Sequence, residues 1–437
     1  MPSLRSRSLS RRDVIRTSAA VAGAAALGSC RLPIAAAQSY TGDFVIASVT
    51  ETAQAADTIA AIQAAYPGVN VVWRYLPSER FAELFTASEV AGDQIDLMDM
   101  NGQDMRRYAL GGRLSDLSEV TFLDRFRPIA TDTYTIGETL WALPRGGVSG
   151  FTFFHNKAAL AKIGVTEVPQ TYAELVAMAP ELIQAGIAPF THSGKNIYLW
   201  PVWQFWAHAQ TSGNQAVERT FATLAGDAKF TDPDHVQALE LLYRYGQDGM
   251  FVENVNSLDT DAAWLQFTQG QAAFTYVHSS RIGDYLEGDF PELDLGLATP
   301  LLAVDDPAVR RQLPGGTGNA LALYGEIDDA RREVANGIMD IMTSDAVVQA
   351  MNVLNGDAVS VNVNVTPSTE PLALLYGKEC SPNQITYLDW YWPPEITRAF
   401  QENQQALITG DLNPEQAAEA IQSTLDDLYL DGYEFTT

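Results

Sequence analysis

The chain has 437 residues, 46% of them hydrophobic, and a net charge of −27. Without residues 1–37 it keeps 21 basic and 53 acidic residues. That net charge, near −32, repels phosphate backbones and anionic lipid headgroups, so we expect no binding to nucleic acid or to a membrane surface.

The N-terminal segment has the pattern of an export signal. Arg11 and Arg12 stand just before an uncharged stretch, residues 17–29, made mostly of Ala, Gly, Val and Leu. A charged region followed by a short apolar one indicates export, and paired arginines there indicate the twin-arginine route. Taken instead as a basic turn before a helix, the stretch is too short to span a bilayer and has no amphipathic face to bury. We predict a twin-arginine signal peptide at residues 1–37 and a periplasmic mature protein.

Two cleavage sites fit this signal. Small residues at 35–37 precede Gln38, which favours cleavage after Ala37. The alternative is the segment 27–30, Leu-Gly-Ser-Cys, which fits a lipobox and would anchor the protein outside the cytoplasmic membrane through a lipid on Cys30. Beyond Cys30 only Cys380 remains, so no disulfide framework is expected.

The first elements of the mature chain alternate between strand and helix. In chain order we predict a strand at 44–49, a helix at 57–66, a strand at 69–75, a helix around 81–85 and a strand at 95–100. This order indicates an α/β fold with a parallel, doubly wound sheet. Ligands of such sheets bind beyond the carboxyl ends of the strands, here residues 48–52, 75–78 and 99–103.

Later segments continue the mixture of helix and strand. We predict a hairpin at 134–143 that turns at Gly137, strands at 150–156 and 273–277, a largely helical stretch over 171–290, a loop-rich stretch over 300–318, a strand at 319–324, and helices at 328–342, 344–354, 394–409 and 413–429. About 400 mature residues exceed one ordinary core, which predicts two lobes.

Short segments along this order carry a resemblance to a known family. They are residues 65–71 (AYPGVNV), 92–97 (GDQIDL, with isoleucine where the family usually has proline), 140–144 (LWALP), 153–157 (FFHNK), 269–274 (QGQAAF) and 413–417 (NPEQA). With these segments, residues 44–429 resemble the bacterial extracellular solute-binding proteins of the maltose-binding type, the receptors of ABC sugar importers. Most of the motif residues end or begin helices and are expected to touch no ligand.

The resemblance implies a fold of two lobes joined by a hinge, each lobe a doubly wound sheet flanked by helices. We place the N-terminal lobe at 42–147 with 299–356 and the C-terminal lobe at 148–298 with 357–437. It also implies a monomer that captures a small sugar in the cleft between the lobes and delivers it to the membrane permease subunits of an ABC transporter.

Enzyme signatures are missing from the sequence. It has no Gly-x-Ser-x-Gly and no His-Glu-x-x-His, and Ser193-Gly194-Lys195 continues into Asn196, unlike a phosphate loop. We expect no catalysis, no metal and no cofactor. Two alternatives remain: the same fold holding a glycerol phosphodiester or an organic cation, and a secreted glycosidase that uses a pair of the many carboxylates.

Two aromatic clusters are candidates for stacking on a sugar, at residues 198–206 and 390–394. Trp203 and Trp206 have helical spacing and are expected in the core. Trp200 and Trp392 each precede a proline at a predicted helix start, which favours contact with the ligand. The family often carries a stacking tryptophan at the place of Trp392, and we add Trp390 beside it.

Polar candidates follow the predicted strand ends and crossovers. They are Glu51 after the first strand, Asn101 after the third, Arg145 after the hairpin, His278 after the strand at 273–277, and Gly316 in the loop before the return strand. Hydrogen bonding within a loop is the alternative role for each of them.

Overall fold

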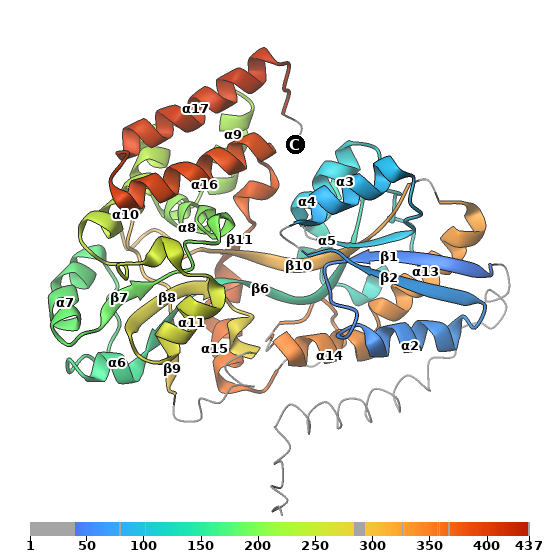
Figure 1. Ribbon diagram of the computed structural model, residues 1–437, viewed down its shortest axis with the longest axis horizontal. Coiled ribbons are helices and arrows are strands. Elements are labelled where there is room, and N and C mark those ends of the chain that lie inside the picture. The colour runs from blue at the N-terminus through green and yellow to red at the C-terminus, as the bar shows by residue number, and fades with distance from the viewer. Residues whose placement is uncertain are drawn as a thin grey trace, which may run out of the picture. The chain divides into compact units, whose positions relative to one another are not determined.

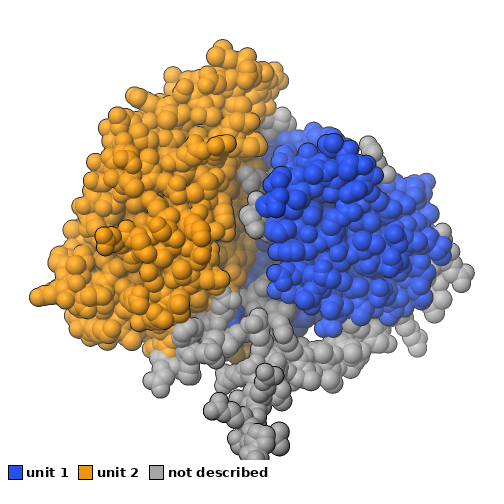
Figure 2. All heavy atoms as spheres, in the orientation of Figure 1, with its two compact units in different colours: residues 1–148, 283–289, 317–368 blue, residues 149–282, 290–316, 369–437 orange. Residues whose placement is uncertain are grey.

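The structure, a computed structural model, describes residues 40–77, 80–100, 102–283, 293–325, 327–355, 357, 359–365 and 368–435. The predicted signal peptide, with Arg11, Arg12, Cys30 and both cleavage sites, lies outside these residues. The described chain forms two compact units, coloured separately in Figure 2. Unit 1 takes in the described residues of 40–148 and 317–368, and unit 2 takes in those of 149–282, 293–316 and 369–435.

Unit 1 is built on the predicted parallel sheet. Its strands are β1 (Gly42–Ser48), β2 (Val69–Tyr75), β3 (Leu97–Met100) and the second half of β10 (Leu313–Leu323). β1 lies between β2 and β3 and runs parallel to both, and β10 pairs antiparallel with β3. The strands predicted at 44–49, 69–75 and 95–100 and the hairpin are confirmed to within a few residues, whereas the strand predicted at 319–324 begins earlier, at Leu313.

Helices cover both faces of this sheet, with α3 and α4 on one face and α2 and α14 on the other (Figure 1). The helices of unit 1 are α2 (Ala56–Ala65), α3 (Phe81–Ala91), α4 (Gly102–Leu110), α5 (Pro128–Asp132), α13 (Asp329–Met342) and α14 (Asp345–Asn355). Phe81 and Phe85 share the buried face of α3, which ends at Gly92 in the left-handed conformation that glycine adopts at low cost. The hairpin of β4 (Thr135–Ile136) and β5 (Thr139–Leu140) turns at Gly137, also left-handed.

Unit 2 contains the second half of β6 (Leu143–Asn156) with β8 (Ala272–His278), β7 (Ala188–Thr191) and β9 (Leu295–Ala298). β6 pairs antiparallel with β8 and β9, and β7 pairs parallel with β8. Its helices are α6 (Lys157–Ala161), α7 (Tyr172–Gln184), α8 (Pro201–Thr211), α9 (Ala216–Leu224), α10 (Pro233–Gln247), α11 (Thr260–Thr268), α15 (Pro371–Glu379), α16 (Pro394–Thr409) and α17 (Pro414–Leu430). Trp203 and Trp206 are buried in its core, as predicted.

The strands β6 and β10, each of which passes from one unit to the other, are longer than predicted. The prolines and glycines at 144–150 and 314–318 indicated loops, yet both segments are extended strand. Pairing with distant residues explains the difference. The backbone N–H of Val148 donates to the carbonyl of Val359 at 2.8 Å, and Leu313 pairs with Gln384 of β11 (Gln384–Ile385).

The division between the units after residue 148 agrees with the predicted lobe boundary to within one residue, whereas the later divisions fall at other places than predicted. Residues 299–316 lie in unit 2, where Leu301 N donates to the carbonyl of Gln170 at 2.9 Å. The described residues of 357–368 lie in unit 1, where Val361 N donates to the carbonyl of Gly146 at 3.1 Å. The proposed boundaries therefore move to the crossing strands themselves, near residues 148 and 316.

Candidate functional site

The carboxyl ends of β1, β2 and β3 meet at one edge of the unit 1 sheet. Ser48, the last residue of β1, lies opposite Tyr75 of β2 and Asp99 of β3. This alignment confirms the strand-end geometry that the sequence predicted. Tyr75, the first residue of the predicted strand end at 75–78, is 41% exposed, so an aromatic side chain lies at this edge.

A polar cluster of Ser48, Thr50, Asp99 and Arg145 occupies the same edge. The Arg145 guanidinium forms an ion pair with Asp99 Oδ2, to which the hydroxyls of Ser48 and Thr50 donate at 2.7 and 3.2 Å. Asp99 is fully buried and Arg145 is 3% exposed. A buried ion pair is tolerated only where further hydrogen bonds offset the loss of hydration, which the two hydroxyls supply.

Two atoms of the polar cluster lack partners. Asp99 Oδ1 and Arg145 Nε are both buried and make no hydrogen bond with any described residue. Leaving a buried polar atom unsatisfied costs about 1–3 kcal/mol, so such atoms in a folded protein call for an explanation. One is an acceptor and the other a donor. A hydroxyl group, which both donates and accepts, has the complementary chemistry.

A third buried polar atom without a partner among the described residues belongs to Thr317 of β10, its Oγ1. The Tyr134 hydroxyl holds the same stretch of β10 through the carbonyls of Thr317 and Gly318, at 3.0 and 2.6 Å. Burial raises the pKa of Tyr134. The Thr317 side chain lowers this pKa by less and the negative charge of Asp99 adds to the rise, so the phenol stays neutral. Gly316, a predicted site residue, precedes Thr317 with a φ of 152° and is half-buried.

Unit 2 carries an aromatic group formed by Phe151, His278, Tyr387 and Trp390. Phe151 meets the edges of His278 and Tyr387 at centroid distances of 5.6 and 6.2 Å, and Tyr387 lies 5.2 Å from Trp390. His278 ends β8, and its Nδ1 lies 3.0 Å from Ser280 Oγ. Burial lowers the pKa of His278 to about 4, so its ring is neutral at pH 7. His278, Tyr387 and Trp390 are each partly exposed.

The structure packs Trp392 and Trp200 differently from what their proline contexts suggested. Trp392 is 6% exposed and stacks on Phe400 at 4.2 Å, with the edge of Phe205 at 5.3 Å. Trp200 is fully buried, and its indole N–H donates to the carbonyl of Gly194 at 3.2 Å. A proline sets the backbone before a helix but not the surface on which the preceding side chain packs. Core packing accounts for both rings, and their contact with a ligand stays a prediction.

The remaining predicted residues have simpler placements. The Glu51 side chain is exposed, and its carbonyl accepts from the backbone N–H groups of Gln54 and Ala55 in the turn before α2. Asn101 lies outside the described residues.

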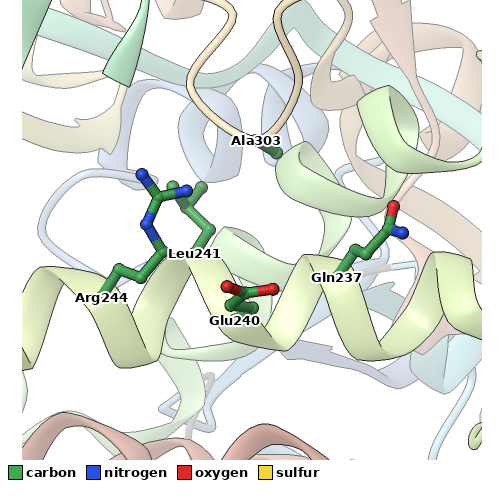
Figure 3. Close-up of a pocket in the computed structure, with 5 residues that line it drawn as sticks. All are labelled: Gln237, Glu240, Leu241, Arg244 and Ala303. Atoms are coloured by element: carbon green, nitrogen blue, oxygen red, sulfur yellow. The ribbon is translucent and has the colours of Figure 1, made fainter. Parts of the chain in front are cut away.

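A separate surface pocket of about 230 Å³ lies on unit 2. Its lining consists of Gln237, Glu240, Leu241 and Arg244 of α10 with Ala303, and Figure 3 shows these side chains along the helix. None of the predicted site residues lines it. Its lining includes no aromatic ring that would stack on a sugar, so the polar cluster and the aromatic group are the better candidates.

The comparison with known proteins agrees with the fold. Residues 47–326 match the profile of the family described as bacterial extracellular solute-binding protein. A probable sugar-binding periplasmic protein of Rhizobium meliloti (strain 1021) is 26% identical over 286 residues, which are 62% of this chain. The match spans 63% of that relative, less than two thirds of its length.

Solved structures extend the likeness over most of the chain. A chitin oligosaccharide binding protein is 20% identical with a TM-score of 0.78, over 89% of this chain and 98% of that one. A sugar transporter protein from Bacillus licheniformis, solved in complex with stachyose, is 17% identical with a TM-score of 0.69, over 87% and 98%. Both have the α/β solute-binding fold that the sequence predicted.

Within the described residues, no helix combines the length and the apolar character needed to cross a membrane. The profile match covers more than half of the chain, and the fold agrees with it. The chain belongs to the bacterial extracellular solute-binding protein family.

Proposed function

We propose that the protein is the substrate-binding component of an ABC transporter, which captures a small carbohydrate outside the cytoplasm and delivers it to the membrane permease subunits. The observation that carries this proposal is the unsatisfied acceptor and donor of the polar cluster, Asp99 Oδ1 and Arg145 Nε. A sugar hydroxyl that reaches the polar cluster can donate to the first or accept from the second. The relative with a probable sugar-binding role and the stachyose complex support the same class of ligand.

The aromatic group of unit 2 suits the apolar part of a sugar. A pyranose has an apolar C–H face, which packs on flat aromatic rings such as those of Tyr387 and Trp390. Hydroxyl recognition at the polar cluster describes a carbohydrate better than an organic cation or a phosphodiester, since Arg145 is already neutralised by Asp99.

The proposal involves no covalent chemistry. The sugar is bound, released unchanged and handed to the permease, and one protein molecule acts alone as a monomer. We further propose that the chain reaches the periplasm by the twin-arginine route and is cleaved after Ala37.

A thermal-shift screen of the mature protein tests this function directly. Mono- and oligosaccharides form the panel, with a glycerol phosphodiester and a quaternary amine as non-sugar solutes. A ligand at a hundred times its Kd stabilises the native state by about 2.7 kcal/mol, so a cognate sugar raises the melting temperature by several degrees. A rise in melting temperature with the non-sugar solutes alone would show that the ligand is not a carbohydrate. Chromatography of the sugar after incubation must show it unchanged, because hydrolysis would identify a glycosidase.

A paired substitution then tests the polar cluster. Asp99→Asn with Arg145→Gln removes both charges together, so no unpaired buried charge is left to destabilise the fold. We expect the double variant to bind the identified sugar at least tenfold more weakly. The control is Arg125→Gln with Asp340→Asn, which removes a partly exposed ion pair of unit 1 with an N–O distance of 2.5 Å. Equal affinity in both double variants would remove the polar cluster from the site.

A further inference from the structure

Three side chains of unit 2, outside the candidate sugar site, converge from two helices. His208 lies in the last turn of α8, and Asp234 and His235 lie in the first turn of α10. The two imidazoles are buried, and the Asp234 side chain is 15% exposed. One possible ligand atom from each of these residues lies within 4.8 Å of those from the other two. We call these three residues the histidine cluster.

The spacing of the histidine cluster is close to that of a metal site. Zinc binds nitrogen and oxygen ligands at about 2.0–2.1 Å, which puts ligand atoms about 3.4 Å apart in a tetrahedron. His208 Nε2 lies 3.0 Å from Asp234 Oδ2, and the two imidazole rings are 4.0 Å apart between centroids. The ligand atoms lie within 4.8 Å of one another, so none of these separations has to shorten by more than about 1.4 Å, and water would be the fourth ligand.

The hydrogen bonds define where each imidazole carries its proton. A carboxylate only accepts, so His208 Nε2 donates to Asp234. The Thr223 hydroxyl donates to the carbonyl of Arg219, so it accepts from His235 Nε2 at 3.1 Å. Burial lowers the pKa of both histidines, and in these tautomers the free lone pair of each neutral ring is on Nδ1. His208 Nε2, the atom 3.0 Å from Asp234, can therefore bind a metal only after its proton moves to Nδ1. Two imidazoles and a carboxylate form a donor set typical of zinc and its neighbours in the transition series.

Arg219 of α9 competes with a metal for Asp234. Its guanidinium donates to Asp234 Oδ2 and Oδ1 at 2.8 and 3.0 Å, and also to Asp232 Oδ2 at 2.8 Å. Although burial raises it, hydrogen bonds from His208 and Arg219 hold the pKa of Asp234 well below its usual range. Arg219 is 29% exposed, and Asp232 offers it a second carboxylate. The guanidinium can therefore release Asp234 and still keep an ion pair.

We propose that His208, Asp234 and His235 bind one divalent transition-metal ion, of which zinc is the best match, while Arg219 moves from Asp234 to Asp232. The ion ties the end of α8 to the start of α10. This site could not be predicted from residue spacing, because the ligands come from separate helices and His208 lies 26 residues before Asp234.

The test uses the tag-free mature protein after treatment with a chelator. Calorimetric titration with zinc chloride is expected to give one equivalent bound, and cobalt(II) is expected to give the visible absorption bands of a tetrahedral site. Binding should weaken at least a hundredfold in His208→Gln and in His235→Gln, because a lost ligand costs more than the loss of an outer-shell partner. The matched control is His155→Gln, a histidine of β6 outside the histidine cluster, which should bind as the unaltered chain does.

Arg219→Gln keeps the proposal testable if the histidine variants fold poorly. Removing the competing guanidinium should tighten zinc binding, by about tenfold. If the histidine cluster is only an ion-pair network, this variant loses stability and binds no zinc. The proposal is overturned if the unaltered chain takes up no stoichiometric zinc. It is also overturned if zinc binds equally well to the double variant in which both His208 and His235 are replaced by glutamine.

Discussion

At the scale of single residues, removal of the buried Thr317 hydroxyl should affect ligand binding and the stability of the fold differently. Its Oγ1 makes no hydrogen bond of good geometry with the described residues and interacts only with the Tyr134 hydroxyl, so the native fold gains little from it. Removing an unsatisfied buried hydroxyl while keeping the side-chain shape is neutral or stabilising. A ligand that bonds to this hydroxyl, by contrast, loses that bond when the hydroxyl is removed.

We therefore predict that Thr317→Val keeps or raises the melting temperature and weakens sugar binding by about 0.5–1.5 kcal/mol, a factor of up to roughly ten. The control is Thr343→Val in the same unit. The Thr343 hydroxyl donates to the carbonyl of Met339 at 2.8 Å, so its loss should lower stability and leave affinity unchanged. Melting curves and calorimetric titration of both variants provide the comparison. Unchanged affinity in Thr317→Val would show that this hydroxyl does not contact the ligand.

The two neighbouring tryptophans Trp390 and Trp392 are expected to respond in opposite ways. Trp390 is partly exposed, and Trp390→Ala should weaken sugar binding by about 1.5–3 kcal/mol through lost apolar burial. Trp392 stacks on Phe400 in the core, and Trp392→Ala should destabilise the fold by about 3–5 kcal/mol. Urea unfolding and calorimetry on each variant separate the two effects. Loss of affinity in Trp392→Ala with normal stability would restore the role that the sequence suggested for it.

At the scale of elements, periodicity predicted the helices and most strands because each pattern is local. The lengths of β6 and β10, by contrast, depend on pairing with residues that are distant in the sequence. Pro144 and Gly316 look like loop residues until their partners are known, and those partners lie far along the chain, as with Val148 and Val359. The same limit applies to the site. Arg145 was predicted from its place after the hairpin, and Asp99 lies in the predicted strand end at 99–103. Their ion pair could not be predicted, because it joins residues 46 apart.

Close packing of backbones where β6 and β10 run through unit 2 gives a prediction about stability. A Cβ placed on Gly150 would lie 2.5 Å from Gly315 Cα and from the carbonyl oxygen of Pro314. Backbone atoms cannot give way as a flexible side chain does, so Gly150→Ala should cost about 1–3 kcal/mol or more. Urea unfolding measures this cost, and an unchanged free energy of unfolding would show that the strands can separate without strain.

The N-terminal segment carries the prediction about export. Replacing Arg11 and Arg12 by lysine should leave an uncut precursor in the cytoplasm, since the twin-arginine route requires the guanidinium pair. Cell fractionation measures this outcome, and normal export of the lysine variant would reject the route. Mass spectrometry of the unaltered mature chain separates the two cleavage sites. A start at Gln38 supports cleavage after Ala37, whereas a lipid on Cys30 would identify an anchored protein.

At the scale of the whole molecule, the net negative charge affects both the stability of the fold and the association of two copies. A net charge near −32 after residue 37 makes the compact state repel itself and makes two copies repel each other. Salt screens exposed charges beyond about 10 Å at 0.1 M, so the repulsion weakens as ionic strength rises. This repulsion can be predicted from the sequence alone, because it depends on composition and not on which residues pair.

We predict that the melting temperature rises by several degrees between 0.01 M and 0.5 M sodium chloride, and that the protein stays monomeric across that range. The rise comes from screened self-repulsion, which outweighs the screened surface ion pairs because each of those contributes only about 0–1 kcal/mol. Potassium chloride at the same concentrations serves as the control, since a specific sodium site would respond to sodium alone. Scanning calorimetry and multi-angle light scattering at each salt concentration measure both quantities. A melting temperature that falls with salt would mean that attractive ion pairs outweigh the repulsion, and a mass that doubles at high salt would mean that repulsion alone had kept two copies apart.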